Sequence, residues 1–159
     1  MSINTNSKDH RASFSYQLMQ LSRSWRRLDE KIMAEHGYHD VSWVPLIHLH
    51  GAAPMMQKEL AARCGLDTSS LVRLLTPLTE QGLVKRTPNP DDGRAWLLKL
   101  TKKGNQRAEH INGILRQSEE AMLNAIPKEL IEAFLQITQR INNNINQINN
   151  DPSYDPSDR

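Results

Sequence analysis

Four side chains within six residues have the chemistry to bind a nucleic acid. They are Thr68, Ser69, Ser70 and Arg73. An arginine can donate two parallel hydrogen bonds to O6 and N7 of guanine, which makes Arg73 a candidate for reading a base. The short hydroxyls suit contacts to phosphates or to a thymine methyl group. The alternative is that Arg73 is an ordinary exposed charge on a helix.

Residue types that support catalysis or metal binding do not form a comparable pattern. The pairs His36/His39 and His48/His50 are close in sequence, but no cysteine or carboxylate completes a zinc-binding spacing with them. The sequence has no phosphate-binding glycine loop and no nucleophile elbow. Cys64 is expected to be a buried thiol rather than a redox switch. We therefore expect a protein that is not an enzyme and needs no cofactor and no metal.

Positive charge is concentrated in the middle of the chain. Residues 56–107 carry ten Lys/Arg and five Asp/Glu, whereas residues 108–159 carry four and eight, in a chain of net charge +2. A locally basic segment in a near-neutral chain suggests contact with a polyanion. An ordinary solvated surface would fit the charge alone equally well.

Composition and length indicate an ordinary globular protein. The 159 residues predict one compact domain, and 24% charged with 38% hydrophobic residues is enough to bury a core. The chain has no apolar run of eighteen residues, and residues 1–11 do not resemble a secretory signal. The single cysteine cannot form an internal disulfide. Together these features predict a cytoplasmic location without a membrane span.

The candidate residues must be positioned by a series of helices. Apolar residues spaced by three and four predict a long first helix over residues 12–36, ended by Gly37. Three shorter helices are predicted over residues 42–50, 56–64 and 68–81. Glycines at 51, 65 and 82 end them, and either Asp67 or Thr68 can cap the third.

A hairpin and two further helices are predicted after Gly82. Strands over residues 83–87 and 95–100 flank a turn rich in Pro, Asn and Gly. A long helix over residues 102–125 can be capped by Thr101. A last helix over residues 128–149 has Pro127 in its first turn and an apolar stripe. The stripe consists of Leu130, Phe134, Ile137, Ile141, Ile145 and Ile148.

The two helices between residues 56 and 81 have the spacing of a helix-turn-helix. That motif needs a small residue in the first helix, a glycine at the turn and an apolar residue that faces inward from the second helix. Ala61, Gly65 and Leu71 fill these three places. Many unrelated helix pairs share this spacing, but the following β-hairpin makes the pattern more specific.

Residues 57–104 resemble the winged helix-turn-helix of the MarR family. The resemblance is carried by Leu60-Ala61, Gly82-Leu83-Val84, Asp92-x-Arg94 and Leu100-Thr101. Within the family, Ser70-Leu71-Val72-Arg73 and Trp25-Arg26 look most like the SlyA type. The resemblance extends over residues 14–148 and implies a transcriptional regulator that binds double-stranded DNA.

The resemblance also implies roles for the hairpin, or wing. Arg94 matches the wing arginine that enters the minor groove, and Asp92 would orient it through a salt bridge. Lys85 and Arg86 are candidate phosphate contacts, as are Lys102 and Lys103. Two positions depart from the family pattern. Gly93 replaces a second wing arginine, and Pro77, inside the second helix of the motif, is expected to kink that helix and push Thr76 away from helical angles.

The family further implies a homodimer, and the apolar stripes at both ends of the chain favour one independently. The expected fold is mainly α with a small β-wing: a winged helix-turn-helix embedded in an α-helical dimerisation domain. Residues 12–37 and 102–149 would form the dimerisation region, residues 40–101 the DNA-binding domain, and residues 151–159 a disordered tail. The alternative is that the stripes pack within one chain. A two-fold dimer would read a near-palindromic promoter site.

Family members often respond to aromatic acids, which implies a possible small aromatic carboxylate or phenolic ligand. The SlyA-type pocket uses an arginine and a tryptophan, and the corresponding residues in this sequence are Arg23 and Trp43. Ile47 stands where the pocket often has a histidine. Trp43 could equally be a core residue.

The competing interpretation of the whole chain is a winged-helix module for protein–protein contact that does not bind DNA. Such a module would keep the fold and lose the basic face. Arg73, Arg94 and the basic middle segment argue against it.

Overall fold

The computed structural model describes residues 13–151; of the side chains in that range, those of Gly93 and Arg94 are not described. The expected tail 151–159, apart from Asp151, and the segment 1–11 lie outside the described residues. Contacts within the chain divide it into two compact units, one ending at Glu119 and the other beginning at Glu120.

The first helix, α1 (Phe14–Glu35), begins at Ser13, whose hydroxyl accepts a hydrogen bond from the Tyr16 backbone N–H at 3.3 Å. It ends before Gly37, which has a φ of +87°. An L-residue with a side chain rarely adopts that angle, so glycine is the natural helix stop here. The predicted first helix is confirmed over residues 14–35, while its expected first residue, Ala12, lies outside the described residues.

The helix-turn-helix consists of α3 (Gln57–Cys64) and α4 (Thr68–Glu80), preceded by α2 (Trp43–Leu49). Gly65, with a φ of +65°, makes the turn between α3 and α4. Asp67 caps α4, since its carboxylate accepts from the Ser70 backbone N–H at 2.8 Å. The three predicted helices are present, and Asp67 rather than Thr68 is the capping residue.

Pro77 does not end α4, and Thr76 stays in the helix, so the expectation that Thr76 leaves helical angles is wrong. The helix continues because Leu75 and Leu78, on either side of Pro77, are 2% and 3% exposed. Burying a leucine side chain contributes about 1.5–3 kcal/mol, so the two together offset the roughly 3 kcal/mol cost of a proline inside a helix. The Thr76 hydroxyl also donates to the Val72 carbonyl at 3.0 Å.

A three-stranded antiparallel sheet, in the order β1-β3-β2, completes the winged domain. Its strands are β1 (Met55–Met56), β2 (Val84–Asn89) and β3 (Asp92–Leu100). The sequence prediction missed β1 and started a helix at Met56. A two-residue strand has no periodicity to detect, and it exists because Met55 pairs with the buried Leu98. The hairpin strands are also longer than predicted, leaving only Pro90 and Asp91 between them.

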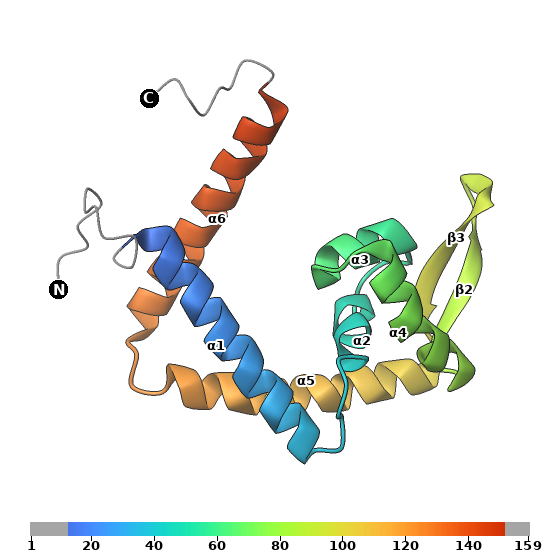
Figure 1. Cartoon of the computed structure of the whole chain (residues 1–159), viewed down its shortest axis with the longest axis horizontal. Coiled ribbons are helices and arrows are strands. Elements are labelled where there is room, and N and C mark those ends of the chain that lie inside the picture. The colour runs from blue at the N-terminus through green and yellow to red at the C-terminus, as the bar shows by residue number, and fades with distance from the viewer. Residues whose placement is uncertain (1–12, 152–159) are drawn as a thin grey trace. The chain divides into compact units, whose positions relative to one another are not determined.

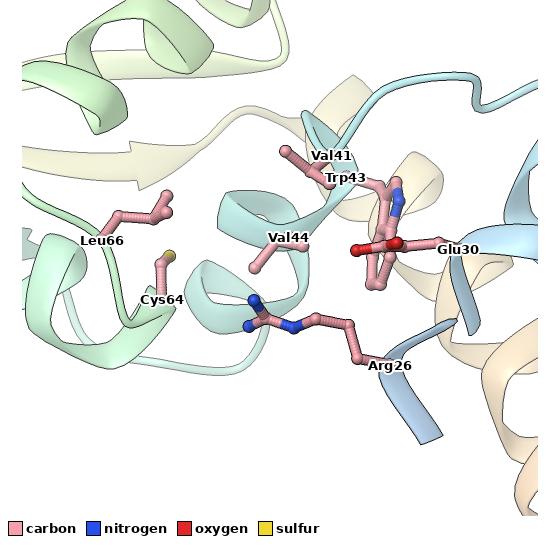
Figure 2. A pocket seen from close by; sticks show the side chains of 7 residues that line it. All are labelled: Arg26, Glu30, Val41, Trp43, Val44, Cys64 and Leu66. Carbon is pink, nitrogen blue, oxygen red and sulfur yellow. The ribbon is translucent and has the colours of Figure 1, made fainter. Parts of the chain in front are cut away.

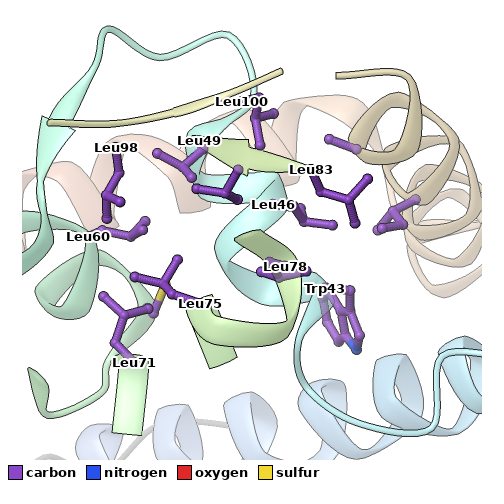
Figure 3. Packing of buried hydrophobic residues seen from close by; sticks show 14 of the residues in the cluster. Trp43, Leu46, Leu49, Leu60, Leu71, Leu75, Leu78, Leu83, Leu98 and Leu100 are labelled. Carbon is purple, nitrogen blue, oxygen red and sulfur yellow. The ribbon is translucent and has the colours of Figure 1, made fainter. Parts of the chain in front are cut away.

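The core of the first unit lies where α2, α3, α4 and the sheet meet (Figure 3). Leu46, Leu60, Leu71, Leu75 and Leu98 are each at most 2% exposed. The inward residues of α4 are spaced by three and four, so the opposite side of this helix is left facing solvent.

The helix α5 (Lys102–Leu123) is fixed to the wing at its first turn. The Thr101 hydroxyl accepts from the Gly104 backbone N–H at 3.0 Å and donates to the Gly82 carbonyl at 2.6 Å. A Cβ at Gly104 would lie 2.0 Å from the Leu83 carbonyl oxygen, so only glycine fits this approach.

The last helix, α6 (Lys128–Asn150), begins after Pro127, which is the capping residue and not part of the first turn as expected. In α6, all of which the structure describes, no residue is buried. The predicted apolar stripe is therefore open to solvent in the single chain. Leu130 is 61% exposed and Ile137 is 48% exposed.

Candidate nucleic-acid interface

The amino-terminal end of α4 is built around the Asp67 carboxylate. It accepts from the Ser69 hydroxyl at 2.5 Å and from the Ser70 hydroxyl at 2.6 Å, in addition to the backbone bond that caps the helix. The hydroxyls of Ser69 and then Ser70 hold the pKa of Asp67 well below its usual range. These two serines, predicted to contact DNA, therefore already donate their hydroxyl protons within the chain, while their oxygens remain able to accept.

The exposed face of α4 carries the predicted base-reading residue. Arg73 and Thr68 are exposed, as expected for residues that contact DNA. The structure adds two residues that sequence reasoning missed, Val72 and Thr76, which are also exposed. Their spacing could have identified them: with Leu71 and Leu75 facing inward, the residues one position later face outward. Val72 offers an apolar surface of the kind that packs on a thymine methyl group.

The wing presents the predicted basic residues on both of its faces. Lys85 and Arg86 are exposed neighbours on β2, so their side chains point to opposite sides of the hairpin. Lys85 lies directly opposite Lys99 of β3, a residue not singled out from the sequence. Two like charges in this position repel each other, and a phosphate between them would relieve the repulsion.

The predicted pair of Asp92 and Arg94 is only partly described. Both residues belong to β3, and Asp92 is exposed near the hairpin turn. The side chain of Arg94 is among those not described, so its entry into the minor groove and its ion pair with Asp92 stay predictions.

The two lysines at the start of α5 differ in their surroundings. Lys102 is exposed, whereas Lys103 donates from Nζ to the Gln81 carbonyl at 3.0 Å. Gln81 is the capping residue at the carboxyl end of α4, where a cation interacts favourably with free carbonyl groups. Lys103 therefore stabilises the carboxyl end of α4, and its other N–H groups remain able to donate, so its contact with a phosphate stays a prediction.

A small hollow that opens to solvent lies beside Trp43 (Figure 2). It is lined by Arg26, Glu30, Val41, Trp43, Val44, Cys64 and Leu66. Trp43 is 6% exposed, as a core residue is, and it also forms a wall of this cavity. Its contact with a ligand stays a prediction. The arginine in the cavity is Arg26, one helical turn after the predicted Arg23, which is exposed and does not line it. Ile47 packs against the hydrophobic core instead.

Cys64 is buried, as expected, and burial raises its pKa to about 11. A thiol with so high a pKa is almost wholly protonated near neutral pH, which makes it a poor nucleophile and metal ligand. Across residues 13–151, no group of three or more His, Cys, Asp or Glu side chains is arranged to hold a metal ion. Over that same span, no helix is long and apolar enough to cross a membrane.

Comparison with solved structures places this fold among transcriptional regulators. The regulator PA3341 matches with a TM-score of 0.77 and 30% identity, over 84% of this chain and 98% of that one. NadR in complex with 4-hydroxyphenylacetate matches with a TM-score of 0.72 and 22% identity, over 85% and 96% of the two chains. SlyA matches with a TM-score of 0.68 and 18% identity, over 82% and 94%. At these lower identities NadR and SlyA show a shared fold, so the finer SlyA-type assignment stays a prediction.

The family itself is shown by two findings together. The sequence model of the MarR family matches residues 36–95, which include α2, the helix-turn-helix and most of the hairpin. PA3341 extends the similarity over nearly its whole length at 30% identity. The chain therefore belongs to the MarR family of transcriptional regulators and has the family's winged-helix fold.

Proposed function

We propose that this protein regulates transcription by binding a specific double-stranded DNA site as a homodimer. The observation that carries the proposal is the exposed face of α4, where Arg73 stands between Val72 and Thr76 on a helix held firmly by its opposite side. Arg73 would read a guanine in the major groove, and Val72 and Thr76 would pack on neighbouring bases. The wing, with Lys85, Arg86, Asp92 and Arg94, would reach the adjoining minor groove and its phosphates.

The apolar stripe of α6 supports the dimer. Five of its large side chains are between 41% and 61% exposed in the single chain: Leu130, Phe134, Ile137, Ile145 and Ile148. An apolar face of this extent marks a surface that is covered in the assembled protein. A second copy is the simplest partner, because a two-fold dimer also presents two copies of α4 to successive major grooves.

Selection from a random pool of duplexes tests DNA recognition and, in the same experiment, yields the operator sequence. The parent protein should enrich a near-palindrome whose half-sites are about 10 bp apart, the spacing of successive major grooves on one side of DNA. Enrichment of no sequence, with binding that depends only on salt, would contradict specific recognition. A winged module for protein contact would enrich nothing and bind no duplex.

We further propose that a small aromatic carboxylate binds in the cavity beside Trp43 and weakens DNA binding. Trp43 offers a ring for stacking, and the Arg26 guanidinium can hold a carboxylate with two hydrogen bonds. Glu30 lines the same cavity, so the carboxylate must lie on the side of Arg26 (Figure 2). The bound 4-hydroxyphenylacetate of NadR has the same chemistry, an aromatic ring and a carboxylate.

Salicylate, titrated against the protein on its selected duplex, tests the ligand proposal. It should weaken DNA binding by a coupling of about 1–3 kcal/mol, and salicyl alcohol, which lacks the carboxylate, should have less effect. The Arg26→Ala variant should lose the response, whereas Arg23→Ala should keep it. Loss of the response in Arg23→Ala alone would show that Arg23, the residue predicted from the sequence, binds the carboxylate instead of Arg26. No release from the parent would refute this ligand class.

A further inference from the structure

The wing exposes a tryptophan that none of the roles above uses. Trp96 lies in β3 directly opposite Pro88 of β2 and is 55% exposed, whereas Trp43 is 6% exposed. Exposing a large indole to water is costly unless a partner covers it, since burial of apolar area stabilises the protein. Trp96 and Pro88 together form an exposed apolar step on the hairpin.

The pairing of the strands shows on which face of the sheet this step lies. Residues two apart on a strand share a face, so Trp96 lies on the same face as Leu98 and Leu100, which are 2% and 7% exposed. On β2, Arg86 pairs with Leu98, which places it on this face as well. Figure 1 shows the hairpin extending past α3 and α4. The core face of the sheet therefore continues outward as an exposed strip formed by Arg86, Pro88 and Trp96.

The chemistry of this strip fits the sugar–phosphate backbone of DNA. Arg86 can donate to a phosphate, while the flat faces of Trp96 and Pro88 match the apolar C–H surface of a deoxyribose. Lys85 and Lys99 on the other face make this part of the wing positive on both sides, which favours a polyanion over a neutral partner. Asp91 and Asp92 lie further out, at the turn.

We propose that Trp96, with Pro88 and Arg86, packs against the DNA backbone beside the groove that the wing enters. The proposal rests on the DNA-binding function above and adds a contact that the wing arginine does not provide. Because the contact is to sugar and phosphate, it strengthens binding to every sequence by a similar factor. Trp96 would therefore raise the affinity for any duplex, whereas Arg73 would distinguish one base sequence from another.

Binding titrations with a fluorescent selected duplex and a scrambled duplex of equal composition test this role. Trp96→Ala should weaken binding to both duplexes by about tenfold, which corresponds to about 1.4 kcal/mol. Trp96→Phe, which keeps an aromatic ring, should recover most of the loss. Thr87→Ala, on the opposite face of the hairpin, is the matched control and should bind like the parent. Because Trp96 is exposed, Trp96→Ala should unfold at the parent's temperature.

Fluorine NMR of protein labelled with 5-fluorotryptophan gives a second measurement. The Trp96 signal, assigned by its absence in Trp96→Phe, should shift when either duplex is added. If the parent binds the selected duplex while Trp96→Ala binds equally well and the signal does not move, the backbone contact is refuted and the proposed function stands. If the parent binds no duplex, both proposals fail together.

Discussion

At the scale of single residues, the amino-terminal end of α4 depends on one carboxylate. Asp67 caps α4 and holds the hydroxyls of both Ser69 and Ser70, so three residues predicted from the sequence as a cap and two DNA contacts form one hydrogen-bonded unit. Such a unit fixes the first turn of α4 in the free protein, which would lower the entropy lost in the proposed binding to DNA.

The unit predicts a pH dependence of stability. Because the pKa of Asp67 is lowered in the folded state, its contribution is complete above the ordinary value of 3.8 and is lost as the pH falls through the lower folded value. Asp67→Asn keeps an acceptor oxygen but cannot titrate. At neutral pH the midpoint of thermal unfolding should therefore be highest for the parent, lower for Asp67→Asn and lowest for Asp67→Ala.

Repeating the melts in acid isolates the titration of Asp67 from that of the other carboxylates. The difference between the parent and Asp67→Asn should shrink as the pH falls below about 3.8, since protonation leaves the parent with a neutral cap too. A difference that does not change with pH would show that Asp67 is not the stabilising acceptor.

At the scale of elements, the close contact between the first turn of α5 and the start of the wing leaves no room for a side chain at Gly104. A Cβ at Gly104 would meet the Leu83 carbonyl oxygen at 2.0 Å, while a Cβ at Gly113, in the same helix, would meet nothing within 4 Å. Gly104→Ala should destabilise the protein by about 1–3 kcal/mol, the usual cost of overpacking. Gly113→Ala should instead stabilise it by about 0.5–1 kcal/mol, because alanine loses less entropy in a helix. Chemical unfolding of both variants measures the change in the free energy of unfolding. Equal changes in the two variants would contradict the close approach of Gly104 to the Leu83 carbonyl.

The helices could be predicted from the sequence because each has a stripe of apolar residues and a glycine or cap at its end. The strand β1 could not, since two residues have no period. Helix continuity through Pro77 depends on how deeply Leu75 and Leu78 are buried, which is a tertiary effect.

The candidate sites were predictable to the same extent. Residue type and position in the family motif predict the roles of Arg73 and Trp43. The spacing of Val72 and Thr76 from the inward leucines also predicts that both face outward from α4. That Arg26 rather than Arg23 lines the cavity depends on the rotation of α1 about its axis, which sequence spacing does not fix. The exposure of Trp96 depends on how far the hairpin continues beyond the core.

At the scale of the whole molecule, assembly should depend on the stripe of α6. Ile137→Asp with Ile141→Asp should convert the proposed dimer to a monomer of 18.2 kDa, because buried unpaired charges are costly, and operator binding should be lost with it. Gln139→Asp with Asn143→Asp places the same charges at the same spacing on the polar face and should leave the dimer intact. Sedimentation measures both. A monomeric parent that still binds a palindrome tightly would contradict this assembly.

The central claim, that α4 reads base sequence, is tested most directly by measuring affinity for the selected duplex against a panel in which each base pair is changed in turn. Arg73→Ala should cost about 1–3 kcal/mol on the selected duplex and lose discrimination at one position in each half-site, while discrimination at the other positions is kept. If Arg73→Ala keeps the parent's affinity and its preference at every position, α4 does not read the DNA through Arg73 and the claim fails.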